Sequence, residues 1–250
     1  MQRATLTGPV GPPAPSVSTS PTLPPIPTAR VAPSWTSLAR TTQGRPILAT
    51  ESGTGPLRIY LIGGIHGDET EGRTALESLK DQLASSSLAT LRIIRDMNPD
   101  GTIAHRRTNA RGRDLNRNWP AANFTPSTNR GPSPLSERES AAIHKDLLAF
   151  NPDIVIVLHS IASGPFVNYD GPAATLADTF VKAAKSTDPH WKVQPEMGYR
   201  TPGSLGSYLG IDRNLPILTI EFKRGQDEAS ATAALEKGLA AIVQTPRKPS

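Results

Sequence analysis

The chain has 250 residues, a net charge of +5 and no cysteine. This length allows one domain with a substantial core, and the lack of cysteine excludes disulfide bonds and thiol chemistry. No apolar stretch approaches the roughly 20 residues of a membrane-spanning helix. The arginines clustered over 106–117 lack the interleaved aromatic residues of a surface that binds single-stranded nucleic acid, so they favour an anionic substrate instead.

The first 34 residues differ in composition from the rest of the chain. They are rich in proline, threonine and serine and contain no acidic residue. Such a segment buries too little apolar surface to offset its ordering entropy, so we expect a disordered tail over 1–34 and a folded domain over 35–246. The tail lacks the apolar stretch of a signal peptide. The compartment stays open: the bacterial cytoplasm if Met1 is the native start, the cell envelope if an export segment precedes it.

Strand and helix patterns alternate from Trp35 onward. The first half of the domain predicts strands over 44–51, 57–65 and 91–97 and a helix over 70–84, where apolar residues recur at helical spacing. The tetrapeptide 98–101, Asn-Pro-Asp-Gly, is a strong turn signal.

The second half of the domain continues the alternation. Ser136 and Glu139 form a capping-box pattern that opens a helix over 136–150. Strands follow over 153–158 and 216–222, with helices over 173–185 and 227–244, while 109–130 and 161–171 read as irregular loops. The predicted fold is an α/β three-layer αβα sandwich with a central mixed, mostly parallel sheet.

Four ionisable residues lie where apolar strands end. His66 and Glu69 follow the strand over 57–65, His159 follows the strand over 153–158, and Glu221 ends the apolar run from Pro216. The carboxyl ends of strands are where open α/β sheets build their sites. Two imidazoles and one carboxylate leave the fourth tetrahedral position of zinc open for water, as in catalytic rather than structural zinc sites.

Each of these motifs alone is also compatible with a solvated polar turn, and their occurrence together in order favours a zinc hydrolase. His105, beside the arginines, is the replacement ligand should His66 not bind metal.

The most specific string in the chain is Asp-Leu-Asn-Arg-Asn-Trp at 114–119. Taken with the His-x-x-Glu turn, Arg-x-Asn at 107–109, Leu-His-Ser at 158–160 and Thr-Ile-Glu-Phe at 219–222, it resembles the zinc carboxypeptidase family, the carboxypeptidase A-like peptidases. The compact spacing, the Gly-Ile-His-Gly-Asp-Glu turn and the segment 201–208 are similar to the bacterial murein peptide amidase A branch. The resemblance spans roughly residues 35–243.

The resemblance implies a role for each matched residue. His66, Glu69 and His159 would bind one Zn²⁺ ion, and Glu221 would be the general base. Asn116 and Arg117 would bind a substrate carboxylate, and Tyr199 would contact substrate. The arginine that stabilises the oxyanion would be Arg106 or Arg107, of which the Arg-x-Asn pattern favours Arg107.

Three functions follow as hypotheses. The first is hydrolysis of an amide bond next to a free carboxylate, in a murein peptide at the D-glutamyl–diaminopimelate bond or at a peptide C-terminus. The second is a zinc deacylase of N-acyl amino acids, because the desuccinylase and aspartoacylase relatives share the His-x-x-Glu turn. The third is a non-catalytic module that binds cell-wall peptides. The intact Glu221 disfavours the third, because a binding module needs no general base. The partner expected in every case is a peptide or small acylated substrate, not a nucleic acid.

Overall fold

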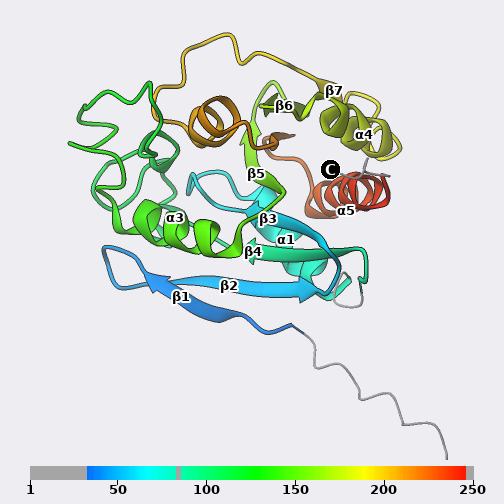
Figure 1. Cartoon of the computed structure of the whole chain (residues 1–250), viewed down its shortest axis with the longest axis horizontal. Helices are drawn as coiled ribbons and strands as arrows, with labels where there is room; N and C mark the ends of the chain where they lie inside the picture. The colour runs from blue at the N-terminus through cyan, green and yellow to red at the C-terminus, as the bar shows by residue number, and fades with distance from the viewer. Residues whose placement is uncertain (1–32, 83–85, 246–250) are drawn as a thin grey trace, which may run out of the picture. The chain divides into compact units, whose positions relative to one another are not determined.

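The computed structural model describes residues 33–82 and 86–245. The tail predicted for 1–34 therefore lies almost wholly outside the described residues. The unit that follows is built around one eight-stranded sheet in the order β1-β2-β4-β3-β5-β8-β6-β7 (Figure 1). The strands are β1 (Thr36–Arg40), β2 (Pro46–Gly53), β3 (Leu57–Ile62), β4 (Ala89–Ile94), β5 (Ile154–Ile161), β6 (Phe166–Asp170), β7 (Lys192–Val193) and β8 (Ile217–Lys223).

The centre of this sheet is parallel and its flanks are mixed. Strands β4, β3, β5 and β8 pair in parallel, as does β7 with β6. Strands β1 and β2 on one side, and β6 on the other, are antiparallel to their inner neighbours. The prediction of a mixed, mostly parallel sheet is confirmed.

Helices cover both faces of the sheet, which confirms the three-layer αβα prediction (Figure 1). Helices α1, α4 and α5 pack on one face and α3 on the other. Their bounds are α1 (Glu71–Gln82), α3 (Arg138–Phe150), α4 (Ala174–Ala184) and α5 (Glu228–Gln244), with short elements α2 (Pro99–Ile103), η1 (Leu115–Arg117) and η2 (Ser207–Ile211). None of the helices in the described ranges is both long and apolar enough to cross a bilayer.

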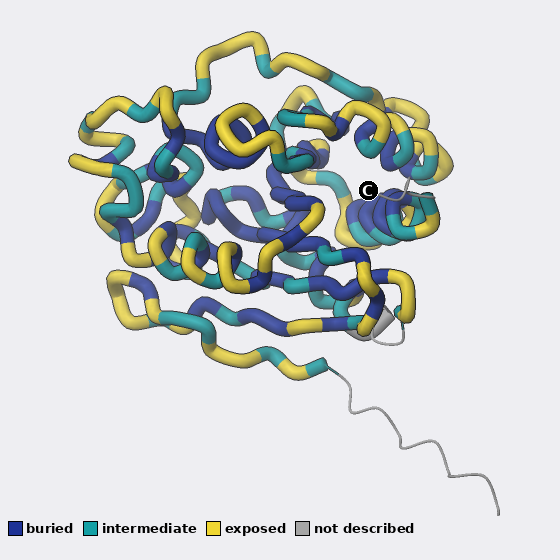
Figure 2. Tube along the Cα trace, in the orientation of Figure 1, coloured by how far each residue is buried: buried dark blue, intermediate teal, exposed yellow. Residues whose placement is uncertain are grey.

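Because both faces are covered, the inner strands are mostly apolar on both sides and mostly buried (Figure 2). In β5, Val155 and Val157 face the α3 side, whereas Ile156 and Leu158 face α1 and α5. Continuing this alternation by two residues places His159 on the α3 side. Glu221 lies directly opposite His159 in the β5–β8 register, so the two side chains share one face.

Three strands were not predicted from the sequence. Strand β1 precedes the expected first strand, and β6 lies inside the segment 161–171 that was expected to be irregular. β6 is short and enclosed by Gly164-Pro165 and Gly171, which are chain-breaking signals. β7 has only two residues.

Two local predictions were wrong. The expected turn at 98–101 is instead the start of α2, because the Asn98 side chain accepts a hydrogen bond from the Gly101 N–H at 3.0 Å and caps a helix. The capping box at Ser136 does not form, because Glu137 is the N-cap and makes no side-chain cap bond, while Glu139 accepts a hydrogen bond from the Thr42 N–H instead.

Candidate active site

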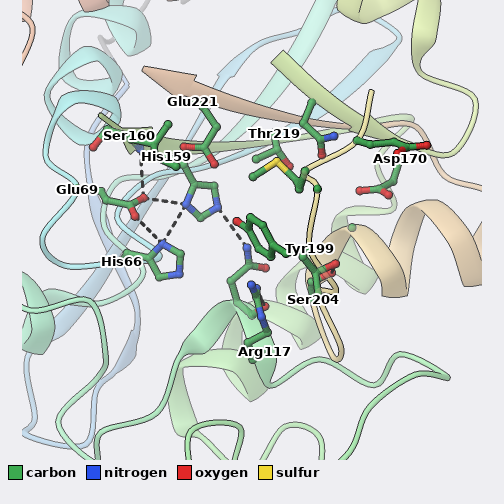
Figure 3. Close-up of a pocket in the computed structure, with 18 of the residues that line it drawn as sticks. His66, Glu69, Arg117, His159, Ser160, Asp170, Tyr199, Ser204, Thr219 and Glu221 are labelled. Carbon is green, nitrogen blue, oxygen red and sulfur yellow. Dashed lines mark hydrogen bonds and ion pairs between the residues drawn. The ribbon is translucent and has the colours of Figure 1, made fainter. Parts of the chain in front are cut away.

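Three side chains, two from the turn after β3 and one from β5, converge in one buried cluster. Nδ1 of His66 lies 3.0 Å from Oε1 of Glu69, and Nδ1 of His159 lies 2.8 Å from Oε2 of the same carboxylate. The two Nδ1 atoms are themselves 3.0 Å apart (Figure 3). All three side chains are nearly inaccessible to solvent. The structure thus brings together the three residues predicted to bind metal.

The backbone holds this cluster through a tight turn after β3. His66 to Glu69 lie between β3 and α1, and the Glu69 N–H donates to the His66 carbonyl. At Gly67 a Cβ atom would come within 2.1 Å of the Gly101 carbonyl carbon, so only glycine lets the turn lie against α2. His159 lies within β5, which runs three residues further than the strand predicted for 153–158.

The donor set fits a divalent metal ion. Two imidazole nitrogens that face each other at 3.0 Å need a cation or a proton between them, and each also faces a carboxylate oxygen. The candidate ligand atoms all lie within 4.8 Å of one another. Neutral imidazole and carboxylate are the ligands that first-row divalent ions prefer.

The electrostatics of the cluster also favour a cation. Burial alone would raise the pKa of Glu69, but the neighbouring imidazoles of His159 and His66 hold it well below its usual range. Burial would lower the pKa of His66, yet its hydrogen bonds to Asp114 and Glu69 raise it above the usual value. The ionised carboxylates therefore attract positive charge to the space between the two imidazole rings. A metal ion bound there would displace any proton held between the two Nδ1 atoms.

Asp114 completes the cluster, although the sequence suggested no role for it. Its Oδ1 lies 3.0 Å from Nε2 of His66, on the opposite side of the ring from Glu69. Burial would raise the pKa of Asp114, but His66, Arg107 and Arg117 hold it well below its usual range. An ionised carboxylate at Nε2 keeps the proton there and leaves the Nδ1 lone pair for a ligand. The signal that could have identified it is its position at the head of the string 114–119.

Glu221 projects from β8 into the same pocket (Figure 3). Within the described ranges, no group donates a hydrogen bond to its carboxylate. Burial raises its pKa; His159 partly opposes this and the Glu69 charge adds to it. A buried carboxylate that accepts no hydrogen bond and has a raised pKa is suited to proton transfer.

Only one of the two adjacent arginines, Arg106 and Arg107, lines the pocket. Arg107 lines the pocket, its Nε 3.1 Å from Oδ2 of Asp114 and its Nη1 3.2 Å from Oε1 of Glu69. Arg106 and His105 are exposed and are not among the lining residues. Of the two arginines, Arg107 is therefore the one that faces the pocket, and His105 is not part of the candidate ligand cluster.

Asn116 and Arg117 line this cavity, whose volume is about 580 Å³, and Arg117 lies on the side away from Glu221 (Figure 3). The Asn116 amide lies 3.3 Å from Nε2 of His159, and its Oδ1 accepts a hydrogen bond from the Leu205 N–H. Arg117 donates through Nη1 to the Asn116 carbonyl at 2.8 Å. The guanidinium is thus oriented but half-buried, with other N–H groups available to a ligand.

Tyr199 lies on the segment that follows β7 and lines the pocket while 56% of its surface is exposed. This segment is held at both ends. The Asn168 side chain donates to the carbonyls of Gln194 and Pro195, both at 3.0 Å, and the Gly203 N–H donates to the Asn123 side chain at 2.9 Å.

Four further ionisable lining residues were not identified from the sequence: Asp170, Glu196, Arg200 and Arg224. Arg224, three residues beyond Glu221, donates to the Ser160 carbonyl at 3.2 Å and lies 3.4 Å from Asp68. Asp170, the last residue of β6, contributes a carboxylate to the far end of the pocket. Asp170 was missed because β6 was missed.

The succinylglutamate desuccinylase/aspartoacylase catalytic-domain family matches residues 56–197. Murein peptide amidase A of Escherichia coli strain K12 is 32% identical over 198 residues, which cover 74% of this chain and 77% of that protein. The protein of the same name from Vibrio campbellii is 28% identical over 224 residues, covering 83% and 85%.

Solved structures give the same result. The murein-tripeptide amidase of Escherichia coli O157 superposes with a TM-score of 0.68 at 25% identity, covering 86% of this chain and 94% of that one. Carboxypeptidase A of Helicoverpa armigera superposes with a TM-score of 0.70 at 16% identity, covering 85% and 69%, which shows the shared fold. The resemblance inferred from the motifs is confirmed, because these relatives are murein peptide amidases and the shared fold is that of carboxypeptidases. The chain is a hydrolytic metallopeptidase that belongs to the succinylglutamate desuccinylase/aspartoacylase family and is similar to the murein peptide amidases A.

Proposed function

We propose that this protein is a zinc-dependent amidase that cleaves a peptide bond next to a free carboxylate, with a murein peptide as substrate and the D-glutamyl–diaminopimelate bond as its target. The observation that carries the proposal is the single pocket in which the His66–Glu69–His159 cluster, the buried Glu221 and the Arg117 guanidinium all meet. The murein peptide amidases among its relatives support the substrate class.

In this proposal His66, Glu69 and His159 hold one Zn²⁺ ion. Bound there, zinc would polarise a water molecule and the substrate carbonyl, lowering the pKa of the water toward about 7. Glu221 accepts a proton from the attacking water and delivers it to the leaving amine. Burial raises the pKa of Glu221, which strengthens it as a base for the first of these steps.

Arg107 and Arg117, on the pocket wall, interact with negatively charged groups of the substrate. Arg107 keeps two of its N–H groups on Asp114 and Glu69, which fixes the guanidinium plane, and its remaining N–H groups stabilise negative charge on the carbonyl oxygen. Asn116 and Arg117 orient the substrate by its carboxylate. A guanidinium fork matches a carboxylate with two hydrogen bonds.

The test compares substrates on metal-loaded protein. Wild type is incubated with muropeptides that contain the D-glutamyl–diaminopimelate bond and, separately, with N-succinyl and N-acetyl amino acids, and products are identified by mass. Cleavage of the muropeptide at that bond alone is expected, and Glu221→Gln is the inactive control.

Preferential cleavage of the N-acyl amino acids would instead support the deacylase function, which the family match over 56–197 also allows. Tight muropeptide binding by wild type without any product would support the non-catalytic binding module.

A further inference from the structure

The loop over 107–118 carries several polar residues of the pocket besides the candidate metal ligands. Arg107, Asn116 and Arg117 line the pocket, and Asp114 contacts the ring of His66. The regular structure in this loop is limited to the three residues of η1. Side chains on such a loop keep a fixed geometry when bonds from outside the loop hold its backbone.

Asn109, the last residue of the Arg-x-Asn motif, is the first anchor of this loop. Its Oδ1 accepts hydrogen bonds from the N–H groups of Arg111 and Arg113, both at 3.0 Å, which closes a tight turn. Its Nδ2 donates to Oε2 of Glu137 at 2.9 Å and to Oε2 of Glu139 at 3.3 Å. The amide and both carboxylates are fully buried. Four hydrogen bonds use the whole capacity of the amide, so the turn is fixed to the start of α3.

Asn118 is the second anchor, at the other end of the loop. Its Nδ2 donates to the carbonyls of Arg130 and Ser133 at 2.6 and 3.1 Å. Its Oδ1 accepts a hydrogen bond from the Glu137 N–H at 3.2 Å. Glu137 therefore contacts the loop at both anchors, through its side chain at Asn109 and through its backbone at Asn118.

Glu137 is also the N-cap of α3, a position that favours shorter side chains. Serine, threonine, aspartate and asparagine are preferred there, because their oxygen reaches back to a free N–H group of the first helical turn. Glu137 has the extended backbone of an N-cap, with φ of −96° and ψ of 136°, but makes no such bond. Its side chain extends to Asn109 instead. The stability of the helix does not explain a glutamate at this position, whereas the reach to Asn109 does.

Arginines of the same loop offset the charge of the Glu137 carboxylate without orienting it. Nε of Arg111 lies 3.7 Å from its Oε2, and Nε of Arg113 lies 3.9 Å from its Oε1. Both distances exceed that of a hydrogen bond. The Asn109 amide, at 2.9 Å, is therefore the group that fixes the carboxylate, and the length of the side chain at 137 matters more than its charge.

We infer that Glu137 is a positioning residue of the active site: it holds both ends of the segment 109–118, so that Arg107 and Arg117 keep the geometry in which they meet the substrate. The inference rests on the proposed amidase function. Glu137 is not among the residues that line the pocket, and it acts through Asn109 and Asn118.

The decisive variant is Glu137→Asp, because it opposes stability and positioning. Aspartate is a preferred N-cap, so the melting temperature should stay within about 3 °C of wild type. Its side chain is one methylene too short to keep the bond to Asn109. On a muropeptide with the D-glutamyl–diaminopimelate bond, kcat/KM should therefore fall by about 10- to 100-fold. The fall should combine a lower kcat with a higher KM, because Arg107 and Arg117 both shift. A merely destabilised protein would show a lower apparent kcat at unchanged KM, since its unfolded fraction binds no substrate.

Two further variants separate side-chain length from charge and from stability. Glu137→Gln keeps the length and an oxygen that accepts from Asn109, so kcat and KM should stay within about threefold of wild type. The matched control is Asp146→Asn, which alters another carboxylate of α3 that bonds with Tyr60 and Arg92 and not with the loop. This control should lower the melting temperature and leave KM unchanged.

A readout independent of turnover is hydrogen exchange of the Arg111 and Arg113 amides, which bond with the Asn109 side chain. Exchange at both should be about tenfold faster in Glu137→Asp, with the β5 amides unchanged. Wild-type KM or wild-type exchange at these amides in Glu137→Asp would overturn the positioning role and leave the amidase function intact. No muropeptide cleavage by metal-loaded wild type would refute the proposed function, whereas the exchange rates would still decide whether Glu137 holds the loop.

Discussion

Nε2 of His66 lies 3.0 Å from Oδ1 of Asp114, while Nδ1 of the same ring faces Glu69. The imidazole is thus held between two carboxylates with different roles. The Asp114 carboxylate fixes the ring and its tautomer, and the Glu69 carboxylate would bind the proposed metal ion together with His159. Metal affinity should therefore depend on a residue that does not itself touch the ion.

Asp114→Asn tests this dependence. The variant keeps the shape of the side chain but loses its charge, so we expect metal affinity to fall by about 10- to 100-fold. His66→Ala and His159→Ala, which remove ligands, should abolish tight binding. Affinity is measured by competition with a chromogenic chelator, with Asp178→Asn on the exposed face of α4 as the control. Wild-type affinity in Asp114→Asn would contradict the role of this carboxylate.

Glu221→Gln separates proton transfer from binding. The amide cannot accept a proton, so kcat should fall by several orders of magnitude, whereas metal content and substrate affinity should stay near those of wild type. Single-turnover kinetics, metal analysis and calorimetry on one preparation supply the three values, and Glu228→Gln on α5 is the matched control. Loss of the metal in Glu221→Gln would make Glu221 a ligand instead of a base.

Arg117 should be energetically coupled to the substrate carboxylate. Amidating that carboxylate or introducing Arg117→Ala should each reduce kcat/KM by the equivalent of about 2 kcal/mol, near the low end for truncated charge pairs because this guanidinium is half-buried. The double change should cost little more than either single change, since both remove the same contact. Four enzyme–substrate combinations give the coupling energy. Additive losses would show that Arg117 binds elsewhere on the substrate.

Tyr60 should make the free energy of unfolding depend on pH in the alkaline range. Its buried hydroxyl donates to Asp146 at 2.8 Å. Burial and the Asp146 charge raise its pKa well above 10, the value of an unfolded chain, although Arg92 partly opposes this. Between the two pKa values the folded state binds the extra proton, so this stabilisation is complete below pH 10 and is lost as the pH rises further.

Tyr60→Phe removes this titration. At pH 8 the variant should be less stable than wild type by about 1 kcal/mol because of the lost hydrogen bond. Above pH 10 the difference should shrink by up to about 1.4 kcal/mol per pH unit. Urea unfolding at pH 8 and pH 11 measures both values, with Tyr199→Phe at an exposed position as the control. A constant difference between the two pH values would refute the linkage.

The parts of the site that could be predicted from sequence are those for which the pattern of a single strand is sufficient. The apolar runs of β3, β5 and β8 end in His66, His159 and Glu221, and local patterns are enough to place such residues at the same edge of a sheet. The αβα architecture follows from the same alternation, because buried inner strands must be covered on both faces.

The parts that could not be predicted depend on pairing between distant segments. Asp170 belongs to the pocket only because β6 returns antiparallel beside β8, and no local pattern encodes that register. Asp114 acts on His66 across 48 residues of sequence. The capping box at Ser136 failed for the same reason: Glu139 bonds with the Thr42 N–H, a partner that only the folded chain provides.

The hydrogen bonds from Asn168 to Gln194 and Pro195, and from the Gly203 N–H to Asn123, limit how Tyr199 can move. The stretch between these anchors is a short span tethered at both ends, and it forms part of the pocket wall. Shortening or stiffening 196–202 should therefore alter the rate of substrate association.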